Sequence, residues 1–361
     1  MQPFIALGLA LRARGQPVRI LAPADYAGLV TAYGLPFAPL IGAISELMDP
    51  ALALEALDSA RSRLPLGFAQ RFVSQVSALL PRLAADALAG CADAELIVAS
   101  TLGCYVGRSI AEHLGLPLVP VHFHPFGATW EQPDISFPAV PNGVPLRGLY
   151  YRLSHSLAAH GLSQLLHAPL NTARRQVLGL PRLSRLGAWR AVRHPPPLAL
   201  YAYSALLAPR PRDWPGYHRI TGPWLLDQPS DWVPPPELAA FLADGPPPVY
   251  VGFGSILAGR DPVGVAQIVA EALAQAGMRG LLYRGAWGDL DGFALPDHLL
   301  RIGDTPHDWL FPQLAAVVTH GGAGTVVSAL RAGAPPVVLP VFGDQRLWAR
   351  RVAELGAGPP P

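Results

Sequence analysis

The chain has 361 residues, of which 51% are hydrophobic and only 14% are charged, and its formal net charge is +2. This length is enough for two or three domains, and the apolar fraction excludes a globally disordered chain. All 27 cationic residues are arginines, but they form no basic block of the kind that follows a phosphate backbone, so we exclude nucleic acid as a partner.

Cysteine usage and the N-terminal composition bear on localisation. The two cysteines, Cys91 and Cys104, lie in apolar contexts and cannot form a disulfide framework. No basic region precedes the apolar stretch from Phe4 to Leu11, as it would in a signal peptide. No run of roughly 18 consecutive apolar residues, the length that spans a bilayer, occurs in the sequence. We therefore expect a cytoplasmic protein and leave peripheral membrane contact open.

The first half of the chain alternates between helical and strand-like patterns. Apolar spacing predicts a helix over 3–14, ended by Gly15, and a buried strand over 17–23. Residues 124–148 are rich in proline, glycine and aromatic residues, which predicts a long irregular loop. Alternation of this kind is typical of a doubly wound parallel α/β sheet. The other expected elements are helical segments at 64–89, 107–115 and 149–179, and strands at 95–100, 116–123, 198–204 and 218–224.

Proline crowds residues 226–248, so we place a linker there, between an N-terminal domain at 1–225 and a C-terminal domain at 249–361. The alternation then restarts, which predicts a second parallel sheet. Its expected strands are 249–255, 280–285, 299–304, 315–320 and 335–341, with helices at 262–276, 324–333 and 344–356.

The stretch THGGAGT joins one of these strands to a helix. Gly321, Gly322 and Gly324 would let a ligand approach the unpaired N–H groups of the helix N-terminus, where anions bind. Thr325 offers a hydroxyl and His320 a further donor. The stretch lacks the lysine of a P-loop and does not match GxGxxG. A tight turn with a satisfied histidine is the alternative interpretation.

Three further loops follow strands of the same half: GFGS, ending at Ser255; TPHDW, at 305–309; and VFGDQ, ending at Gln345. Ligands of open α/β sheets bind at the carboxyl ends of the strands. Asp344 could cap the following helix. Alternatively, its carboxylate and the Gln345 amide could bind neighbouring sugar hydroxyls.

The segment 306–359 closely resembles the donor-binding signature of family 1 glycosyltransferases, in the branch related to sterol and antibiotic glycosyltransferases. PFIALGLALRARGQPVRILAP at 3–23, GLPFAPL at 34–40 and RITGPW at 219–224 also resemble this branch, so the similarity covers nearly the whole chain. It implies a GT-B fold, in which two Rossmann-like domains face a cleft. The N-terminal domain of such proteins takes the acceptor and the C-terminal domain takes the nucleotide-sugar donor.

The resemblance implies a UDP-sugar or TDP-sugar as co-substrate, no cofactor and no metal ion. The positive end of the helix after THGGAGT would stabilise the diphosphate leaving group, and the anomeric centre would be inverted. The plant-type signature has a tryptophan and a glutamate for the nucleoside where this chain has about Asp304 and Ser328. By motif position, the implied contacts are Ser255, His320, Gly322, Gly324 and Thr325 for the diphosphate, His307 for the nucleoside, and Asp344 and Gln345 for the sugar.

A general base must deprotonate the acceptor hydroxyl. Relatives open with a strand and a loop that carry the base or its partner, and Met1 stands where they often have valine. We therefore expect the base upstream of Met1, behind a GTG codon taken as the start, and further helices beyond the C-terminus; the upstream DNA would test this. His122, His124 and Asp134 are weaker candidates, and for a histidine there a core or loop role is the alternative.

Aromatic residues around these candidates suit a lipophilic acceptor, although ordinary packing explains them equally well. We expect a hexosyltransferase, with glucose as the preferred sugar, acting on a sterol, polyketide, carotenoid or glycolipid hydroxyl. The alternative is a catalytically incomplete fragment that only binds nucleotide-sugar. A nucleotide-sugar epimerase is disfavoured because matching acidic motifs are missing. The oligomeric state stays open. The aromatic residues that suit a lipophilic acceptor are Phe123, Phe126, Trp130 and Phe137.

Overall fold

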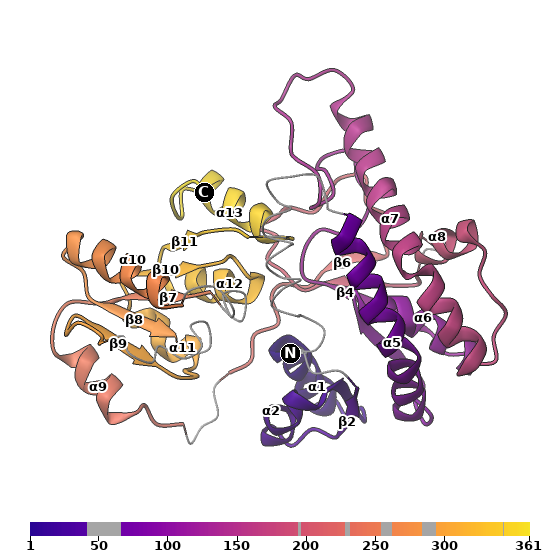
Figure 1. Ribbon diagram of the computed structural model, residues 1–361, viewed down its shortest axis with the longest axis horizontal. Coiled ribbons are helices and arrows are strands. Elements are labelled where there is room, and N and C mark those ends of the chain that lie inside the picture. The colour runs from indigo at the N-terminus through magenta and orange to yellow at the C-terminus, as the bar shows by residue number, and fades with distance from the viewer. Residues whose placement is uncertain (42–65, 194–195, 228–231, 254–261, 284–293, 342) are drawn as a thin grey trace. The chain divides into compact units, whose positions relative to one another are not determined.

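The structure, a computed structural model, describes residues 1–41, 66–193, 196–227, 232–253, 262–283, 294–341 and 343–361 (Figure 1). The chain divides into two compact units between Leu226 and Asp227. Each unit contains parallel strands and helices, which confirms the expected α/β class.

The C-terminal unit is built on a five-stranded parallel sheet in the order β11-β10-β7-β8-β9. All four neighbouring pairs are parallel, so the carboxyl ends of the strands meet at one edge. Strands occur where the sequence predicts them. Their bounds are β7 (Val249–Gly252), β8 (Gly280–Tyr283), β9 (Leu299–Ile302), β10 (Ala316–Thr319) and β11 (Pro336–Val338).

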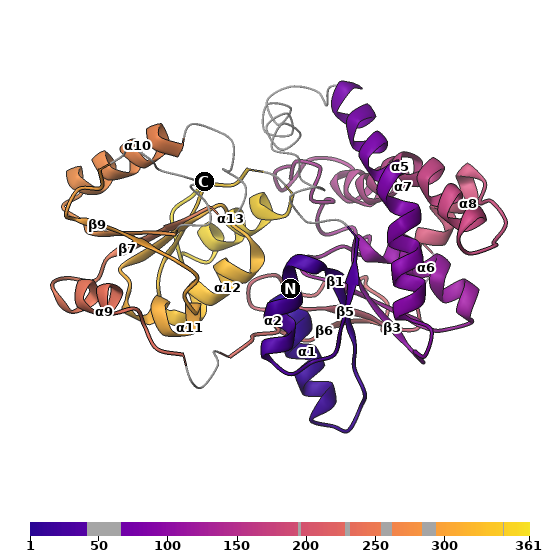
Figure 2. The ribbon, with the colours of Figure 1, turned by 60° about the horizontal axis from the view of Figure 1, so that its bottom comes forward.

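Side chains of this sheet alternate between two apolar layers, as strand geometry requires. Val249 and Val251 pack with α10 (Pro262–Gln275). Tyr250, between them, packs on the other face with α9 (Pro236–Ala243), α11 (His307–Leu310) and α12 (Ala323–Ala332). The helix α13 (Gln345–Glu354) follows β11 (Figure 2). Helices on both faces make this sheet doubly wound, as predicted.

The N-terminal unit contains two sheets. Strands β3 (Ile97–Ser100), β4 (Leu118–His122), β5 (Ala199–Tyr201) and β6 (His218–Ile220) form a parallel sheet in that order. The strands β1 (Ile20–Pro23) and β2 (Phe37–Leu40) form a separate parallel pair. They share a small core with α1 (Gln2–Arg12) and α2 (Ala27–Ala32).

Helices α5 (Leu66–Gly90), α6 (Gly103–Leu114) and α7 (Arg147–Gln176) pack together beside β3 and β4, with α8 (Arg185–Arg193) against α7 (Figure 1). β4 is buried along its whole length. The loop from β4 to α7 is therefore held between a buried strand and a long helix. Within the described ranges, no helix is both long and apolar enough to cross a bilayer. Cys91 and Cys104 are buried free thiols.

Short elements escaped the sequence analysis. We predicted no element for α2, β2 or α8, and we assigned the residues of α9 to the linker. α9 begins with two prolines at its N-terminus, where proline is tolerated, and its Leu238 is buried in the core of the C-terminal unit. The proline-rich stretch therefore contains the start of a helix as well as the connection between the two units.

A buried arginine joins α6 to α7. Arg174, which is 1% exposed, donates to both carboxylate oxygens of Glu112 at 2.7 and 3.0 Å. It also donates to Ser109 Oγ at 3.1 Å and to the Pro181 carbonyl at 3.0 Å. The hydrogen bond from Arg174 lowers the pKa of Glu112. The Glu112 carboxylate is the negative partner of this deeply buried guanidinium.

We expect Glu112→Gln to destabilise the protein at pH 7 by about 1–2 kcal/mol, since the half-exposed carboxylate is partly screened by solvent. A carboxyl group whose pKa is lower in the folded state contributes stability above its unfolded pKa and loses it as pH falls through the folded pKa. The difference between wild type and Glu112→Gln should therefore shrink on acidification from pH 7 to pH 3, measured by urea unfolding. Asp93→Asn, which removes the exposed pair with Arg19, is the control and should change little. A difference that does not depend on pH would contradict this.

Candidate functional site

The glycine turn (residues 320–324) lies at the carboxyl edge of the C-terminal sheet. It connects β10 to α12, while α13 begins shortly after the neighbouring β11. Because β7, β10 and β11 are parallel neighbours, the loops that follow them converge at this edge. Most residues predicted to contact a nucleotide-sugar belong to these loops.

Gly321 explains why the turn needs glycine. Its φ is +93°, and a Cβ there would lie 2.5 Å from Val338 Cγ1 and 3.3 Å from the Gln345 carbonyl oxygen. Only glycine adopts this conformation easily and fits the space. Its N–H donates to Thr319 Oγ1 at 3.4 Å. The turn is thereby packed against β11 and the first residue of α13.

His320 carries an unsatisfied polar atom. Its Nδ1 is buried and has no hydrogen-bond partner among the described residues, and its Nε2 lies 2.8 Å from where a Cβ on Gly322 would be. Burial lowers the pKa of His320, opposed by the Asp344 carboxylate and the Gly252 backbone. The ring is therefore neutral at pH 7 and can donate one hydrogen bond. A buried nitrogen without a hydrogen-bond partner destabilises the fold unless a bound ligand supplies that partner.

The N-terminus of α12 is open to a ligand. Gly322 is the N-cap residue and supplies no side-chain cap, and the first turn contains no acidic residue. A Cβ on the exposed Gly324 would meet no atom within 4 Å, and Thr325 is half-buried beside it. Unpaired N–H groups and the positive end of the helix dipole therefore face accessible space, which favours an anion.

Asp344 and Gln345 lie next to this turn, and both are held by internal hydrogen bonds. Asp344 Oδ2 accepts from Trp348 Nε1 at 2.8 Å, and Asp344 is the N-cap residue of α13 without a side-chain cap. Gln345 Oε1 accepts from the Val341 N–H at 2.7 Å, and Gln345 is only 4% exposed. Asp344 is half-buried and so reaches the surface, whereas the Gln345 amide belongs to the interior. Their sugar-binding role stays a prediction.

His307 begins α11, which packs against α12. Its ring stacks on Phe311 at 4.2 Å between centroids and contacts Tyr250 edge-on. Burial lowers the pKa of His307 to about 4, so the ring is neutral. Its nucleoside role also stays a prediction, and Ser255 lies outside the described residues. No group of His, Cys, Asp and Glu side chains in the described part of the chain could hold a metal ion.

In the N-terminal unit, His122 ends β4 and is packed on all sides. It is 5% exposed, stacks on Phe126 at 4.5 Å, and its Nδ1 lies 2.9 Å from Thr101 Oγ1. Burial lowers the pKa of His122 to about 3, and His124, His218 and Arg108 act in the same direction. These contacts describe a core histidine, which was the alternative interpretation of this residue.

Asp134 is buried where the β4–α7 loop docks on α7. Its N–H donates to Ser154 Oγ at 2.9 Å, and its Oδ1 accepts from the Ser136 N–H at 2.9 Å. Its Oδ2 lies 3.8 Å from Nδ1 of the buried His155. Asp134 therefore anchors the loop. His124, the remaining candidate base, is half-buried and contacts Phe126 edge-on. A catalytic role for any of the three stays a prediction.

The aromatic residues of this loop divide into two groups. Phe123 packs edge-on against Phe4 and Trp224, and Phe126 stacks on His122. In contrast, Trp130 is exposed, and Phe137 lines a groove of about 310 Å³ along the N-terminal part of α7. The groove is almost entirely apolar, and its lining includes Leu149, Leu153 and Leu157, which are exposed.

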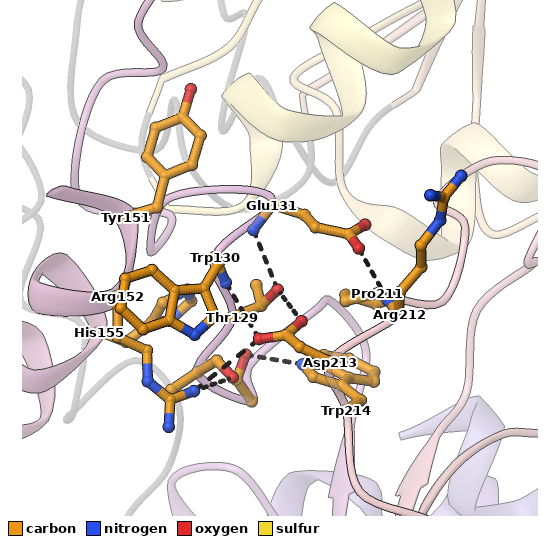
Figure 3. Close-up of polar contacts among 12 residues, drawn as sticks. Thr129, Trp130, Glu131, Tyr151, Arg152, His155, Pro211, Arg212, Asp213 and Trp214 are labelled. Carbon is orange, nitrogen blue, oxygen red and sulfur yellow. Dashed lines mark hydrogen bonds and ion pairs between the residues drawn. The ribbon is translucent and has the colours of Figure 1, made fainter. Parts of the chain in front are cut away.

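Sequence reasoning missed the residue that organises this loop. The carboxylate of Asp213 accepts from Thr129 Oγ1 at 2.5 Å and from the Trp130 N–H at 3.1 Å (Figure 3). Arg152 of α7 donates to the Ala128 carbonyl at 3.0 Å. An acidic residue inside the arginine-rich stretch RPRDWPG was the available signal, but its partners are more than 80 positions earlier.

Known proteins resemble this chain in sequence. Residues 289–360 match the family described as Erythromycin biosynthesis protein CIII-like, C-terminal domain. The O-mycaminosyltylonolide 6-deoxyallosyltransferase of Streptomyces fradiae is 34% identical over 374 residues, covering 100% of this chain and 82% of that protein. The sterol 3-beta-glucosyltransferase of Emericella nidulans is 33% identical over 99% of this chain. The chain spans only 25% of that fungal protein's length.

Solved structures share the fold. The crystal structure of the glycotransferase of kitacinnamycin aligns with a TM-score of 0.67 and 21% identity, covering 99% of this chain and 81% of that one. At this identity the likeness concerns the fold alone.

Proposed function

Because the chain belongs to the family 1 glycosyltransferases of GT-B fold, we propose that it transfers a hexose from a UDP-sugar or TDP-sugar to a hydroxyl of a lipophilic acceptor. Glucose is the preferred sugar in this proposal, and the reaction inverts the anomeric centre without a cofactor or a metal ion. The observation that carries the proposal is the glycine turn, where His320 Nδ1 has no hydrogen-bond partner among the described residues and Gly324 faces open space.

The donor diphosphate would bind at the N-terminus of α12. Backbone N–H groups at Gly322 and Gly324, the Thr325 hydroxyl and His320 would hydrogen-bond its oxygens. During transfer, negative charge develops on the leaving diphosphate, and fixed donors at a helix N-terminus stabilise that charge without reorganising. Asp344 would bind hydroxyls of the transferred sugar beside this site.

The acceptor would bind to the N-terminal unit. The two relatives described above carry names of enzymes that act on a sterol and on O-mycaminosyltylonolide. The groove lined by Phe137, Leu149 and Leu153 offers an apolar surface of matching chemistry. An acceptor of this class is bound mainly through removal of apolar surface from water, at about 25 cal/mol per Å².

A binding-only protein is the second candidate. It is favoured by the three candidate bases, since His122 and Asp134 are buried and hydrogen-bonded and His124 is half-buried against Phe126. Such a protein would bind nucleotide-sugar at the glycine turn and would release it unchanged.

One experiment separates the two candidates. UDP and TDP binding is measured by calorimetry, and UDP-glucose and TDP-glucose are then incubated with the protein and a panel of sterols and macrolide aglycones. Mass spectrometry detects any glycoside. Binding together with a glycoside supports the transferase, and binding without any product supports the binding-only protein. Failure to bind either nucleotide would rule out both.

A further inference from the structure

The segment 127–131, which follows the end of β4, is tied down more firmly than an irregular loop requires. Asp213 accepts hydrogen bonds from Thr129, which is fully buried, and from the Trp130 backbone (Figure 3). The Glu131 N–H in turn donates to Thr129 Oγ1 at 3.1 Å. Three consecutive residues are thus fixed through one carboxylate.

The neighbours of Asp213 in the loop 211–214, and the helix α7, hold the same stretch. The Trp214 indole donates to the Gly127 carbonyl at 3.1 Å, and the Arg212 N–H donates to Glu131 Oε1 at 2.9 Å. From α7, Arg152 donates to the Ala128 carbonyl, and its guanidinium lies 3.9 Å from Asp213 Oδ2. The backbone on both sides of Trp130 is therefore fixed from α7 and from the loop 211–214.

The Trp130 side chain is positioned but not covered. The Arg152 guanidinium lies over its ring, 5.9 Å from the centroid. At Gly148 of α7, an added Cβ would approach the Trp130 ring at 3.3 Å, so glycine makes room for the indole. Nevertheless, Trp130 is 48% exposed, whereas Trp214 in the same network is 4% exposed. Folding alone gives little reason to immobilise an indole and leave half of it in water.

The charges around the indole indicate what it binds. The Asp213 carboxylate lies beside the Arg152 guanidinium. The surface formed by Trp130 and Arg152 therefore does not present an isolated cation to a phosphate. Gly148, where an added Cβ would meet the Trp130 ring, precedes Leu149 of the apolar groove, and the loop from Trp130 continues to Phe137 of the same groove. A neutral ligand with a flat apolar face suits both surfaces. Aromatic faces stack on such ligands with geometric preference and at low entropic cost.

We propose that Trp130 stacks on the ring system of the acceptor, and that Asp213 and Arg152 are positioning residues that fix the orientation of the indole. This inference rests on the proposed function and deepens it by assigning a fused-ring or similarly flat apolar acceptor to this site. Trp130 contacts the acceptor away from the reacting hydroxyl, so it determines acceptor affinity and selectivity and does not take part in the chemical step.

The test compares Trp130→Ala and Trp130→Phe with wild type, using the panel member that wild type glycosylates best. Trp130→Ala should raise the acceptor KM about tenfold and leave kcat and the donor KM within about twofold. Trp130→Phe should restore most of the acceptor affinity. Leu206→Ala, which truncates another exposed side chain of the same unit, is the control and should change nothing. The acceptor Kd, measured by ligand-observed NMR, gives the same contrast without turnover.

A double variant tests the positioning role. If Asp213 acts through Trp130, Asp213→Asn should raise the acceptor KM on its own but add nothing when combined with Trp130→Ala. Thermal unfolding of every variant reports whether the N-terminal unit is intact, because the donor site lies in the other unit. An unchanged acceptor Kd in Trp130→Ala overturns the inference while wild-type turnover upholds the proposed function. Additive effects in the double variant overturn the role of Asp213. A wild type that binds no nucleotide would instead refute the proposed function.

Discussion

Alanine in place of Gly324 is expected to stabilise the protein and, at the same time, to weaken nucleotide binding. Gly324 is near the start of α12, and a methyl group there would meet no protein atom within 4 Å. Replacing a helical glycine whose conformation alanine can adopt stabilises a protein by about 0.4–1 kcal/mol. The same methyl group would project into the space assigned to the diphosphate. We expect about a tenfold loss of UDP and TDP affinity, equivalent to about 1.4 kcal/mol.

Gly321→Ala is the matched control, because it changes the same turn in the opposite way. With φ at +93° and Val338 Cγ1 2.5 Å from the added Cβ, alanine should destabilise the fold by about 1–3 kcal/mol. Thermal unfolding and calorimetric titration with both nucleotides measure the two effects separately. If Gly324→Ala binds UDP and TDP as tightly as wild type, the diphosphate does not bind at the N-terminus of α12.

The alternation of strands and helices made the architecture predictable, and short elements stabilised by tertiary contacts made the boundaries difficult. The strands of the C-terminal sheet are mostly apolar, with Arg301 in β9 as their one charged residue, and such runs are detected by their pattern. In contrast, β2 contains Pro39 and, among the described strands, pairs only with β1, so its local pattern resembles a loop. α9 depends on burying Leu238 in the core formed by Tyr250 and Leu310, which no local pattern reveals.

The glycine turn and the network around Trp130 also differ in how far local sequence predicts them. The glycine turn was predictable because its chemistry is local: a histidine and two glycines stand between β10 and α12, and a third glycine lies in the first turn of α12. The network that fixes Trp130 was not predictable, since Asp213 and Arg152 come from distant segments and are ordinary surface-type residues in the sequence. For His122 the sequence left two interpretations open, a candidate base and a core histidine, because it ends a strand. Its neighbours Phe126, Tyr201 and Thr101 bury it.

Removing the His320 imidazole is expected to weaken nucleotide binding by about 1.5–3 kcal/mol, which is the usual value of a hydrogen bond to a charged group. His320→Ala also removes the buried, unpaired Nδ1, so the variant should lose less stability than other truncations of buried residues. Burial lowers the pKa of the free ring, and a bound diphosphate would raise it. A group whose pKa rises on binding strengthens binding as pH falls. Wild-type affinity for UDP and TDP should therefore increase from pH 8 to pH 6 more steeply than the affinity of His320→Ala. The phosphate groups of the ligand also titrate at about pH 6, but this effect is the same for both proteins and cancels in the comparison.

Two probes separate the predicted contacts of His320 and His307. Inorganic pyrophosphate carries only the group that His320 would bind, whereas UDP also carries the nucleoside assigned to His307. His320→Ala should weaken both ligands by a similar factor, and His307→Ala should weaken UDP while leaving pyrophosphate affinity close to wild type. His307 stacks on Phe311, so its removal should also lower stability, and thermal unfolding of both variants measures that cost. If His320→Ala weakens UDP but leaves pyrophosphate unaffected, the histidine contacts the nucleoside or the sugar. The unpaired Nδ1 would then need a different explanation.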